Sequence, residues 1–223
     1  MGAAIVAKGE GRRAKRPARV QAPLGAGARR RAWRRLCSRL FFGLLALTAP
    51  AGAQNSARYD GTFRKYTKRY FGVGFDWRYF KAQGMAESDL EPTAKSRVGA
   101  RGVMQLMPST FHLIATQRPD FSSIDDPEWN IAAGILHDRD LWRLWEPIVP
   151  DSQRANFMFA RYNAGEGTIT RAAAIARAQR LDHASWPSIE TVAPTVPRWR
   201  YRETLGYVRK IGANYEVLKG ARP

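Results

Sequence analysis

The decisive stretch of the sequence runs from Glu87 to Thr110 and reads ESDLEPTAKSRVGARGVMQLMPST. Its first residue falls near the end of a predicted helix, with Phe80, Gly84 and Met85 around it. A carboxyl group in such surroundings loses part of its hydration, which raises its pKa. A carboxyl held protonated near neutral pH is what a general acid requires. The same position also suits a solvated glutamate on an amphipathic helix, so helix position alone leaves both interpretations open.

Helical periodicity continues on both sides of this stretch. Strict two-residue alternation is absent after residue 53, and valine and isoleucine are sparse, so strands are not favoured. Tyr59, Phe63, Tyr66 and Tyr70 recur at three- and four-residue steps and predict a helix over 59–71. Further helices are predicted over 76–90, from Pro108, from Asp125, and over 151–162, 168–181 and 200–218. We therefore expect an all-α fold, one compact helical domain with at most a short hairpin between residues 93 and 106.

Cap and breaker residues mark the ends of these helices. Asp76 is placed to cap the helix that carries Glu87, and Pro92 is expected to end it. A proline-rich stretch separates the last two helices and holds Pro187, Pro194 and Pro197.

The decisive stretch resembles the catalytic region of lytic transglycosylases of the soluble lytic transglycosylase (SLT) type. Members of that family have E-S, a few residues later P-x-A-x-S, and then G-A-x-G-L-M-Q-L-M-P-x-T. This chain has Glu87-Ser88, Pro92, Ala94, Ser96, Gly99-Ala100, Gly102-Val103-Met104-Gln105-Leu106-Met107-Pro108 and Thr110. The one visible change in the G-L-M-Q string is Val103 for leucine, which is conservative.

Three further strings follow in the order of the family. Residues 126–134, 160–167 and 203–211 resemble D-P-x-x-N-I-x-x-G, A-x-Y-N-A-G-x-G and E-T-x-x-Y-V-x-x-I. The segments Tyr59–Tyr66 and Phe75–Arg78 are most similar to the membrane-bound F branch of the family. The resemblance covers nearly all of 59–218.

The resemblance implies a lysozyme-like fold of the α+β lysozyme superfamily, with a substrate cleft that takes peptidoglycan glycan strands. It also implies cleavage of the β-1,4 bond between N-acetylmuramic acid and N-acetylglucosamine, with a 1,6-anhydro end left on the muramyl residue. Glu87 would serve as the sole acid and base, without a cofactor or a metal. A second carboxylate, as most glycosidases use, is then not required. Glu91 lies four residues after Glu87 and is the alternative second carboxylate, whereas Asp89 is read as a surface acid.

Five further site residues carry over by motif match. Ser96 and Gln105 would hydrogen-bond substrate polar groups, and Met107 would pack on a sugar face. Tyr162 would hold the catalytic carboxyl through its hydroxyl or stack on sugar, and Glu203 would accept sugar hydroxyls in a distal subsite. Core or loop roles for Ser96, Met107 and Tyr162 stay open as alternatives.

Other kinds of catalytic site find little support in the sequence. Cys37 is the only cysteine, which excludes a disulfide framework and a zinc site built on several thiolates. The three histidines, His112, His137 and His183, lack ligand-like spacing and are read as structural or surface residues. No serine or threonine has an evident histidine and aspartate partner set, and no phosphate loop of the G-x-x-x-x-G-K type is present.

The N-terminal segment differs in composition from the rest of the chain. Residues 1–53 hold twelve basic and one acidic side chain and contribute +11 to the net charge of +18. A basic region, the apolar run from Leu40 to Leu47, and Ala51-Gly52-Ala53 together have the form of a secretory signal peptide. The predicted organisation is therefore a leader over 1–53 and a catalytic domain over 54–223. A twin-arginine signal, an uncleaved membrane anchor and a basic nucleic-acid-binding arm are the alternatives.

The charge of the remaining segment also bears on partners and location. Residues 54–223 carry +7, which suits the carboxylates of peptidoglycan. Arg198, Arg200 and Arg202 alternate with Trp199 and Tyr201, but alternating residues do not share a helix face, so nucleic-acid binding is not predicted. We expect an exported, periplasmic protein, with membrane association if the leader is retained and with cell-envelope assembly partners as an open alternative. A goose-lysozyme-like hydrolase and a non-catalytic peptidoglycan-binding protein are the competing functions.

Overall fold

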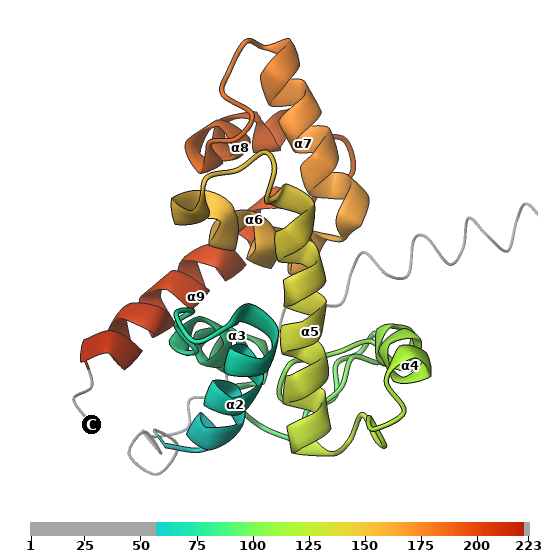
Figure 1. The fold of residues 1–223 in the computed structure, drawn as a ribbon. Coiled ribbons are helices and arrows are strands. Elements are labelled where there is room, and N and C mark those ends of the chain that lie inside the picture. Colours follow the sequence, from blue (N-terminus) through green and yellow to red (C-terminus); the bar gives the residue numbers. More distant parts are fainter. Residues whose placement is uncertain (1–56, 221–223) are drawn as a thin grey trace, which may run out of the picture. The chain divides into compact units, whose positions relative to one another are not determined.

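The computed structural model describes residues 57–220, and their regular structure is helical (Figure 1). Between these residues no strand forms. In chain order the elements are α2 (Asp60–Phe71), α3 (Arg78–Ser88), α4 (Pro108–Gln117), α5 (Pro127–Trp145), α6 (Asp151–Ala164), α7 (Glu166–Ala178), α8 (Trp186–Val192), the 3-10 helix η1 (Ala193–Thr195) and α9 (Tyr201–Gly220). The predicted all-α class is confirmed, while the predicted leader over 1–53 lies outside the described residues.

The helix starts follow from capping and from proline. The carboxylate of Asp126 accepts hydrogen bonds from the backbone N–H groups of Glu128 and Trp129 at 2.8 and 3.2 Å, which caps α5. Pro108 and Pro187 lie in the first turns of α4 and α8, where a missing N–H leaves no helical hydrogen bond unmade. The proline-rich stretch thus forms a short helix and a 3-10 turn.

The C-terminus of α3 differs from the prediction. The helix ends at Ser88, before Pro92 can act, because Asp89 and Leu90 adopt left-handed backbone conformations with φ of 55° and 64°. The N–H of Leu90 reaches back to the carbonyl of Gly84 at 3.4 Å, and the Leu90 side chain is buried. Burial of this leucine therefore turns the chain sharply, directly after Glu87.

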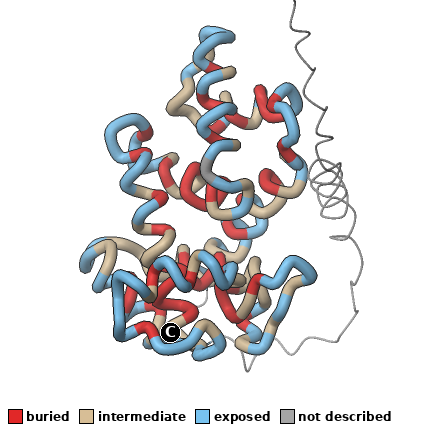
Figure 2. The backbone as a smooth tube through the Cα atoms, turned by 90° about the vertical axis from the view of Figure 1, so that its right-hand side faces the viewer, coloured by how far each residue is buried: buried red, intermediate tan, exposed pale blue. Residues whose placement is uncertain are grey.

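The hydrophobic core surrounds α5. This helix packs against α2 on one side and against α6 on another, while α3 packs along α9. Buried and exposed segments alternate along the helices, as an amphipathic pattern requires (Figure 2). The largest fully buried side chains include Tyr66, Phe80, Phe157 and Ile131.

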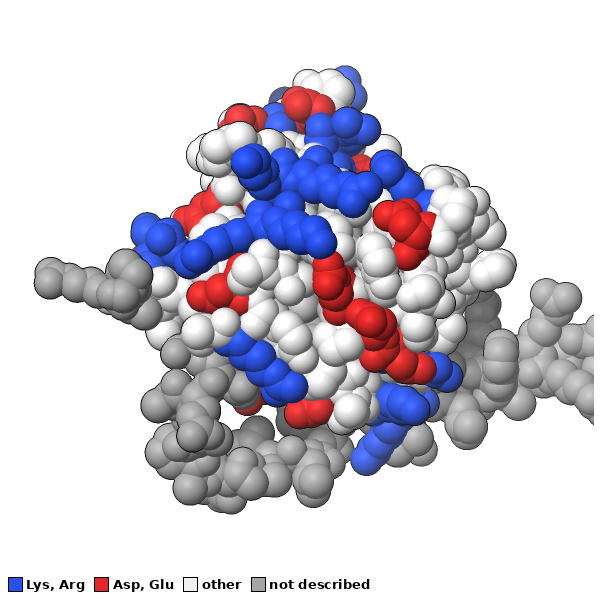
Figure 3. Space-filling model, turned by 60° about the horizontal axis from the view of Figure 1, so that its bottom comes forward, with Lys and Arg blue, Asp and Glu red and all other residues white. Residues whose placement is uncertain are grey.

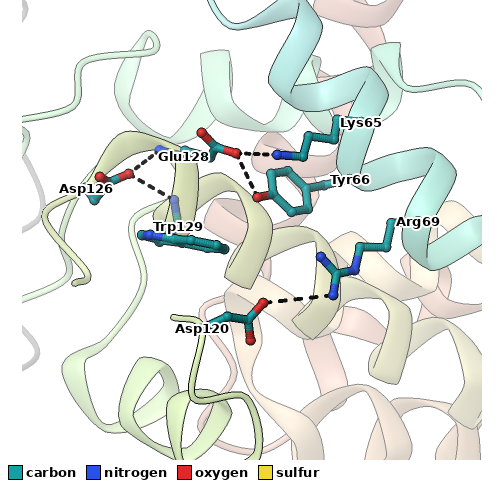
Figure 4. Close-up of polar contacts among 7 residues, drawn as sticks. All are labelled: Lys65, Tyr66, Arg69, Asp120, Asp126, Glu128 and Trp129. Carbon is teal, nitrogen blue, oxygen red and sulfur yellow. Dashed lines mark hydrogen bonds and ion pairs between the residues drawn. The ribbon is translucent and has the colours of Figure 1, made fainter. Parts of the chain in front are cut away.

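Polar contacts fix α2 against the start of α5 (Figure 4). The Glu128 carboxylate accepts from Lys65 Nζ at 2.7 Å and from the hydroxyl of the buried Tyr66 at 2.8 Å. Arg69 forms an ion pair with Asp120 at 3.8 Å on the segment before α5. The ion pairs are exposed and contribute little, so the buried Tyr66 hydroxyl is the more important contact.

The loop between α3 and α4 closes on itself. Isolated antiparallel bridges join Lys95 to Arg101 and Arg101 to Leu106. Backbone hydrogen bonds of 2.9 and 3.0 Å link Arg101 and Leu106 in both directions. The loop is thus held in one shape by backbone pairing, without a hairpin of regular strands.

Candidate active site

Glu87 occupies the last turn of α3 and faces α9. Its Oε1 accepts a hydrogen bond from the Tyr207 hydroxyl at 2.5 Å. The carboxyl is only partly exposed, and burial raises its pKa from 4.5 to about 7. The Tyr207 hydrogen bond and the charge of Lys210 act against burial and lower the pKa. Near neutral pH the group is thus present both as an acid and as a carboxylate, and can donate a proton or accept one.

The loop that follows Glu87 is fastened to α3 and α5. Ser88 Oγ donates to the carbonyl of Val103 at 2.9 Å. Buried Asn130 on α5 accepts from the N–H of Met104 at 2.8 Å and donates to the carbonyl of Arg101 at 2.9 Å. The side-chain oxygen and nitrogen of Asn130 therefore fix the backbone on both sides of Gly102.

Two glycines allow this loop to approach α5 closely. Gly102 has φ of 77°, and a Cβ there would lie 2.4 Å from Nδ2 of Asn130. A Cβ on Gly134 of α5 would lie 2.7 Å from Cγ of Met104. Larger side chains would separate the loop from the helix, which explains glycine in the two family strings at these positions.

Gln105 is turned into the loop. Its backbone has a φ of 45°, and its amide nitrogen donates to the carbonyls of Ala94 and Gly102 at 3.1 and 2.9 Å. Both amide hydrogens are thus used within the loop. Its predicted substrate contact stays a prediction, with the side-chain oxygen as the group that remains for a ligand.

The two other predicted loop residues have different settings. Ser96 Oγ accepts from the N–H of Ala100 at 2.9 Å and stabilises a turn, while its own hydrogen remains for a ligand. Met107 is 40% exposed directly before α4, although most apolar side chains nearby are buried. An exposed methionine is suited to packing on the apolar face of a sugar, and this contact stays a prediction.

The motif predicts that Tyr162 holds the Glu87 carboxyl or stacks on sugar, but in the structure another tyrosine, Tyr207, contacts this carboxyl. The Tyr162 hydroxyl donates to the carbonyl of Met104 at 2.7 Å, so it supports the loop and does not hold Glu87. Tyr207 holds the carboxyl instead. Burial raises the pKa of both tyrosines well above the usual range, which keeps them protonated donors.

Glu203 lies one turn before Tyr207 on the same face of α9. It is partly buried and forms an ion pair with Arg200 at 2.8 Å. The spacing of Glu203 and Tyr207 within one predicted helix could have identified Tyr207 as a site residue, because residues four apart share a face. Its predicted contact with sugar hydroxyls stays a prediction.

Glu91, the alternative second carboxylate, is engaged by a threonine of its own loop. It is exposed and accepts from the Thr93 hydroxyl at 2.7 Å and from the Thr93 N–H at 3.1 Å. These hydrogen bonds lower the pKa of Glu91. The group is therefore an ionised cap of the turn, and the left-handed Asp89 before it is exposed too.

A surface hollow of about 330 Å³ lies between α4 and α5, with Thr110, Ile114 and His137 among its lining residues. The His137 ring packs 5.3 Å from the ring of Tyr162. The hollow therefore adjoins the residues that support the loop. No cluster of three or more His, Cys, Asp or Glu side chains suited to a metal ion occurs within 57–220.

Comparison with known proteins agrees with this arrangement. The profile of the Transglycosylase SLT domain family matches residues 62–184, more than half of the chain. The chain belongs to the transglycosylase SLT domain family. The family resemblance expected from the sequence is thereby confirmed.

Several relatives of this SLT domain are named membrane-bound lytic murein transglycosylase F. The protein from Shewanella pealeana is 30% identical over 172 residues, which cover 72% of this chain and 34% of the relative. The protein from Desulfosudis oleivorans is 31% identical over 158 residues, covering 66% and 34%. The chain thus spans about a third of the length of these relatives.

Solved structures confirm the lysozyme-like SLT fold. The 70 kDa soluble lytic transglycosylase of Escherichia coli superposes with a TM-score of 0.56 at 28% identity, covering 75% of this chain and 25% of that one. A complex of the 70 kDa soluble lytic transglycosylase with bulgecin A gives a TM-score of 0.52 at 26% identity, covering 76% and 26%.

Proposed function

We propose that this chain is an exported lytic transglycosylase of peptidoglycan. It would cleave the β-1,4 bond between N-acetylmuramic acid and N-acetylglucosamine, with Glu87 as the sole acid and base. The observation that carries the proposal is the Glu87 carboxyl itself, which is partly exposed, held by Tyr207, and raised by burial to a pKa of about 7. Membership of the SLT family supports the choice of substrate.

The reaction needs one proton donor that becomes a proton acceptor. Protonated Glu87 gives its proton to the glycosidic oxygen as the bond from that oxygen to the muramyl C1 breaks. The muramyl 6-hydroxyl oxygen then bonds to C1, and the Glu87 carboxylate takes the hydroxyl proton. The acid is regenerated and a 1,6-anhydro ring remains. Because the nucleophile belongs to the substrate, no water has to be positioned.

The surroundings of Glu87 favour this route over hydrolysis. A hydrolase of the usual kind needs a second carboxylate at the sugar. The Glu91 carboxylate accepts hydrogen bonds from Thr93. Asp138, whose pKa Glu87 raises, is fully buried and cannot touch a sugar. Neither Glu91 nor Asp138 is therefore suited to be the second carboxylate of the goose-lysozyme-like alternative.

The non-catalytic alternative is disfavoured by the acid itself. A module that only binds glycan gains nothing from a desolvated carboxyl, because burial of an ionisable group costs stability, and such groups gather at catalytic sites. Glu87 has such burial together with a hydroxyl donor.

Charge and the N-terminal segment support a location in the cell envelope. Lysine and arginine side chains gather in a band across the face shown in Figure 3, beside a row of acidic ones. Such a band would attract the carboxylates of peptidoglycan stem peptides. Within the described part of the chain, none of the helices combines the length and the apolar character needed to cross a bilayer. The leader over 1–53, the domain over 54–223 and periplasmic location remain part of the proposal.

A digest of purified sacculi tests the activity. The chain and its Glu87→Gln variant are incubated with sacculi in parallel, with Glu91→Gln as the matched control, and the products are read by mass spectrometry. We expect 1,6-anhydro muropeptides from the unchanged chain and from Glu91→Gln, and none from Glu87→Gln. Products heavier by one water, with free reducing ends, would establish the hydrolase. Binding to sacculi without any product would establish the non-catalytic module.

A further inference from the structure

Asp138 is a carboxyl that the proposed reaction does not use. It lies on α5 and has no exposed surface. Its Oδ1 accepts from Nε2 of Gln83 at 3.4 Å, and its Oδ2 has no hydrogen-bond partner. Gln83 is also fully buried, and its Oε1 has no partner either. Two acceptor oxygens on neighbouring side chains are thus buried without a donor.

One proton would satisfy both oxygens. If Asp138 carries a hydrogen on Oδ2, it can donate to Oε1 of Gln83, while Nε2 of Gln83 continues to donate to Oδ1. A carboxylic acid and a primary amide then form a pair with two hydrogen bonds. An ionised Asp138 would instead leave a buried charge with one long hydrogen bond, which is strongly unfavourable.

The charged group that affects the pKa of Asp138 is the acidic Glu87, which does not stabilise an ionised form. Gln83 and Glu87 face it from α3, Tyr162 from α6 and Tyr207 from α9. Burial and the nearby Glu87 both raise the pKa of Asp138, in that order, and only the Gln83 hydrogen bond lowers it.

The position of Gln83 connects this pair to the active site. Gln83 lies four residues before Glu87 on α3, so the two side chains share a face of the helix. A fixed Gln83 therefore fixes the last turn of α3 against α5. We propose that Asp138 is a neutral acid paired with the Gln83 amide, and that this pair positions Glu87 for proton transfer. Asp138 is thus a positioning residue, and its kinetic consequence rests on the proposed function.

Neutrality also affects the titration of Glu87. A charged Asp138 would raise the pKa of Glu87 further, because two nearby negative charges repel. A neutral Asp138 leaves Glu87 to respond to burial, Tyr207 and Lys210. Removing the carboxyl while keeping a hydrogen-bond donor in its place should therefore leave the titration of Glu87 unchanged.

Carbon NMR tests the protonation state without any activity. The side-chain carboxyl carbons of Asp138 and Glu87 are followed from pH 4 to pH 9 in the full chain, with assignments from Asp138→Asn and Glu87→Gln. We expect Asp138 to keep the shift of a protonated acid through neutral pH. In Asp138→Asn the midpoint of Glu87 should stay where it is, because the introduced amide also donates to Gln83. An Asp138 that titrates below pH 6, or a Glu87 midpoint that falls in Asp138→Asn, would overturn the proposal.

Kinetics test the positioning role. Asp138→Leu, which keeps the branched shape but removes both hydrogen bonds, should lower kcat about tenfold with little change in KM, whereas Asp138→Asn should stay within about twofold. The exposed Asp182→Asn is the matched control, and circular dichroism establishes that each variant is folded. Equal losses in Asp138→Asn and Asp138→Leu, or full activity in Asp138→Leu, would refute positioning. If the unchanged chain releases no product, the proposed function fails. The NMR midpoint of Glu87 in Asp138→Leu then decides positioning: a moved midpoint supports it and an unmoved one refutes it.

Discussion

Replacing Glu87 with glutamine should stabilise the fold, and increasingly so as the pH rises. The pKa of this carboxyl rises from 4.5 to about 7 on burial. An acid whose pKa is raised by folding binds its proton more tightly in the native state. Its contribution to stability is therefore most favourable at low pH and is lost as the pH rises from 4.5 through 7. Glutamine is neutral at every pH and can still accept the hydrogen bond from Tyr207.

The size of the effect follows from the two pKa values. One pH unit corresponds to about 1.4 kcal/mol, so the interval from 4.5 to about 7 amounts to about 3 kcal/mol when both states are ionised. At pH 5, where the native group is still protonated and the unfolded one is mostly ionised, the same linkage gives a loss of stability of about 1 kcal/mol. Glu87→Gln should thus exceed the unchanged chain in free energy of unfolding by about 3 kcal/mol at pH 8 and by about 1 kcal/mol at pH 5.

Urea unfolding at pH 5 and pH 8 measures this difference. Glu91→Gln is the matched control, because it removes an exposed carboxylate whose pKa is lowered by Thr93. The control should not be stabilised at either pH. The reasoning is refuted if Glu87→Gln shows the same stability difference at both pH values, or if it is less stable than the unchanged chain at pH 8.

Three further substitutions test the supports of the site. Tyr207→Phe removes a hydrogen bond to a charged acceptor worth about 1.5–3 kcal/mol, so kcat should fall about 10- to 100-fold. The alkaline limb of the pH profile of kcat should move to higher pH, because the pKa of Glu87 rises when this hydrogen bond is lost. An unchanged alkaline limb would contradict this. Gly134→Ala places a methyl group against Met104 and should lower the free energy of unfolding by about 1–3 kcal/mol in thermal or urea unfolding, whereas wild-type stability would show that Met104 moves aside freely. Asn130→Ala leaves the N–H of Met104 without its acceptor and should lower the free energy of unfolding by about 3 kcal/mol. Activity should be lost even where the variant remains folded. An active variant would show that the loop keeps its conformation without Asn130.

Local chemistry was sufficient to predict most of the helices and the raised pKa of Glu87, but not α8, which forms in the proline-rich stretch. Periodic aromatic residues predicted α2, and the proline at its first position predicted α4. The end of α3 was misplaced because its signal is tertiary. Leu90 turns inward to be buried, and no residue preference requires an aspartate and a leucine in succession to adopt left-handed conformations.

The partners of the site residues were harder to predict. A motif identifies Gln105 and Tyr162 but not the atoms they contact. The Gln105 amide donates hydrogen bonds to two loop carbonyls, and the Tyr162 hydroxyl donates to a third. Tyr207 contacts Glu87 across 120 positions of sequence. Only the packing of α3 on α9 brings them together, and periodicity within a helix does not tell which helices meet.

Two helices set the acidity of Glu87 from opposite directions. α3 presents the carboxyl in its last turn, where the helix dipole is negative and opposes a further negative charge. α9 supplies the Tyr207 hydroxyl and the Lys210 charge, both of which stabilise the carboxylate. Burial and the end of α3 thus favour the acid, whereas the groups of α9 favour the carboxylate. A group that must give a proton and then take one back needs both influences in near balance. The interface between α3 and α9 is therefore the part of the fold on which the proposed chemistry most depends.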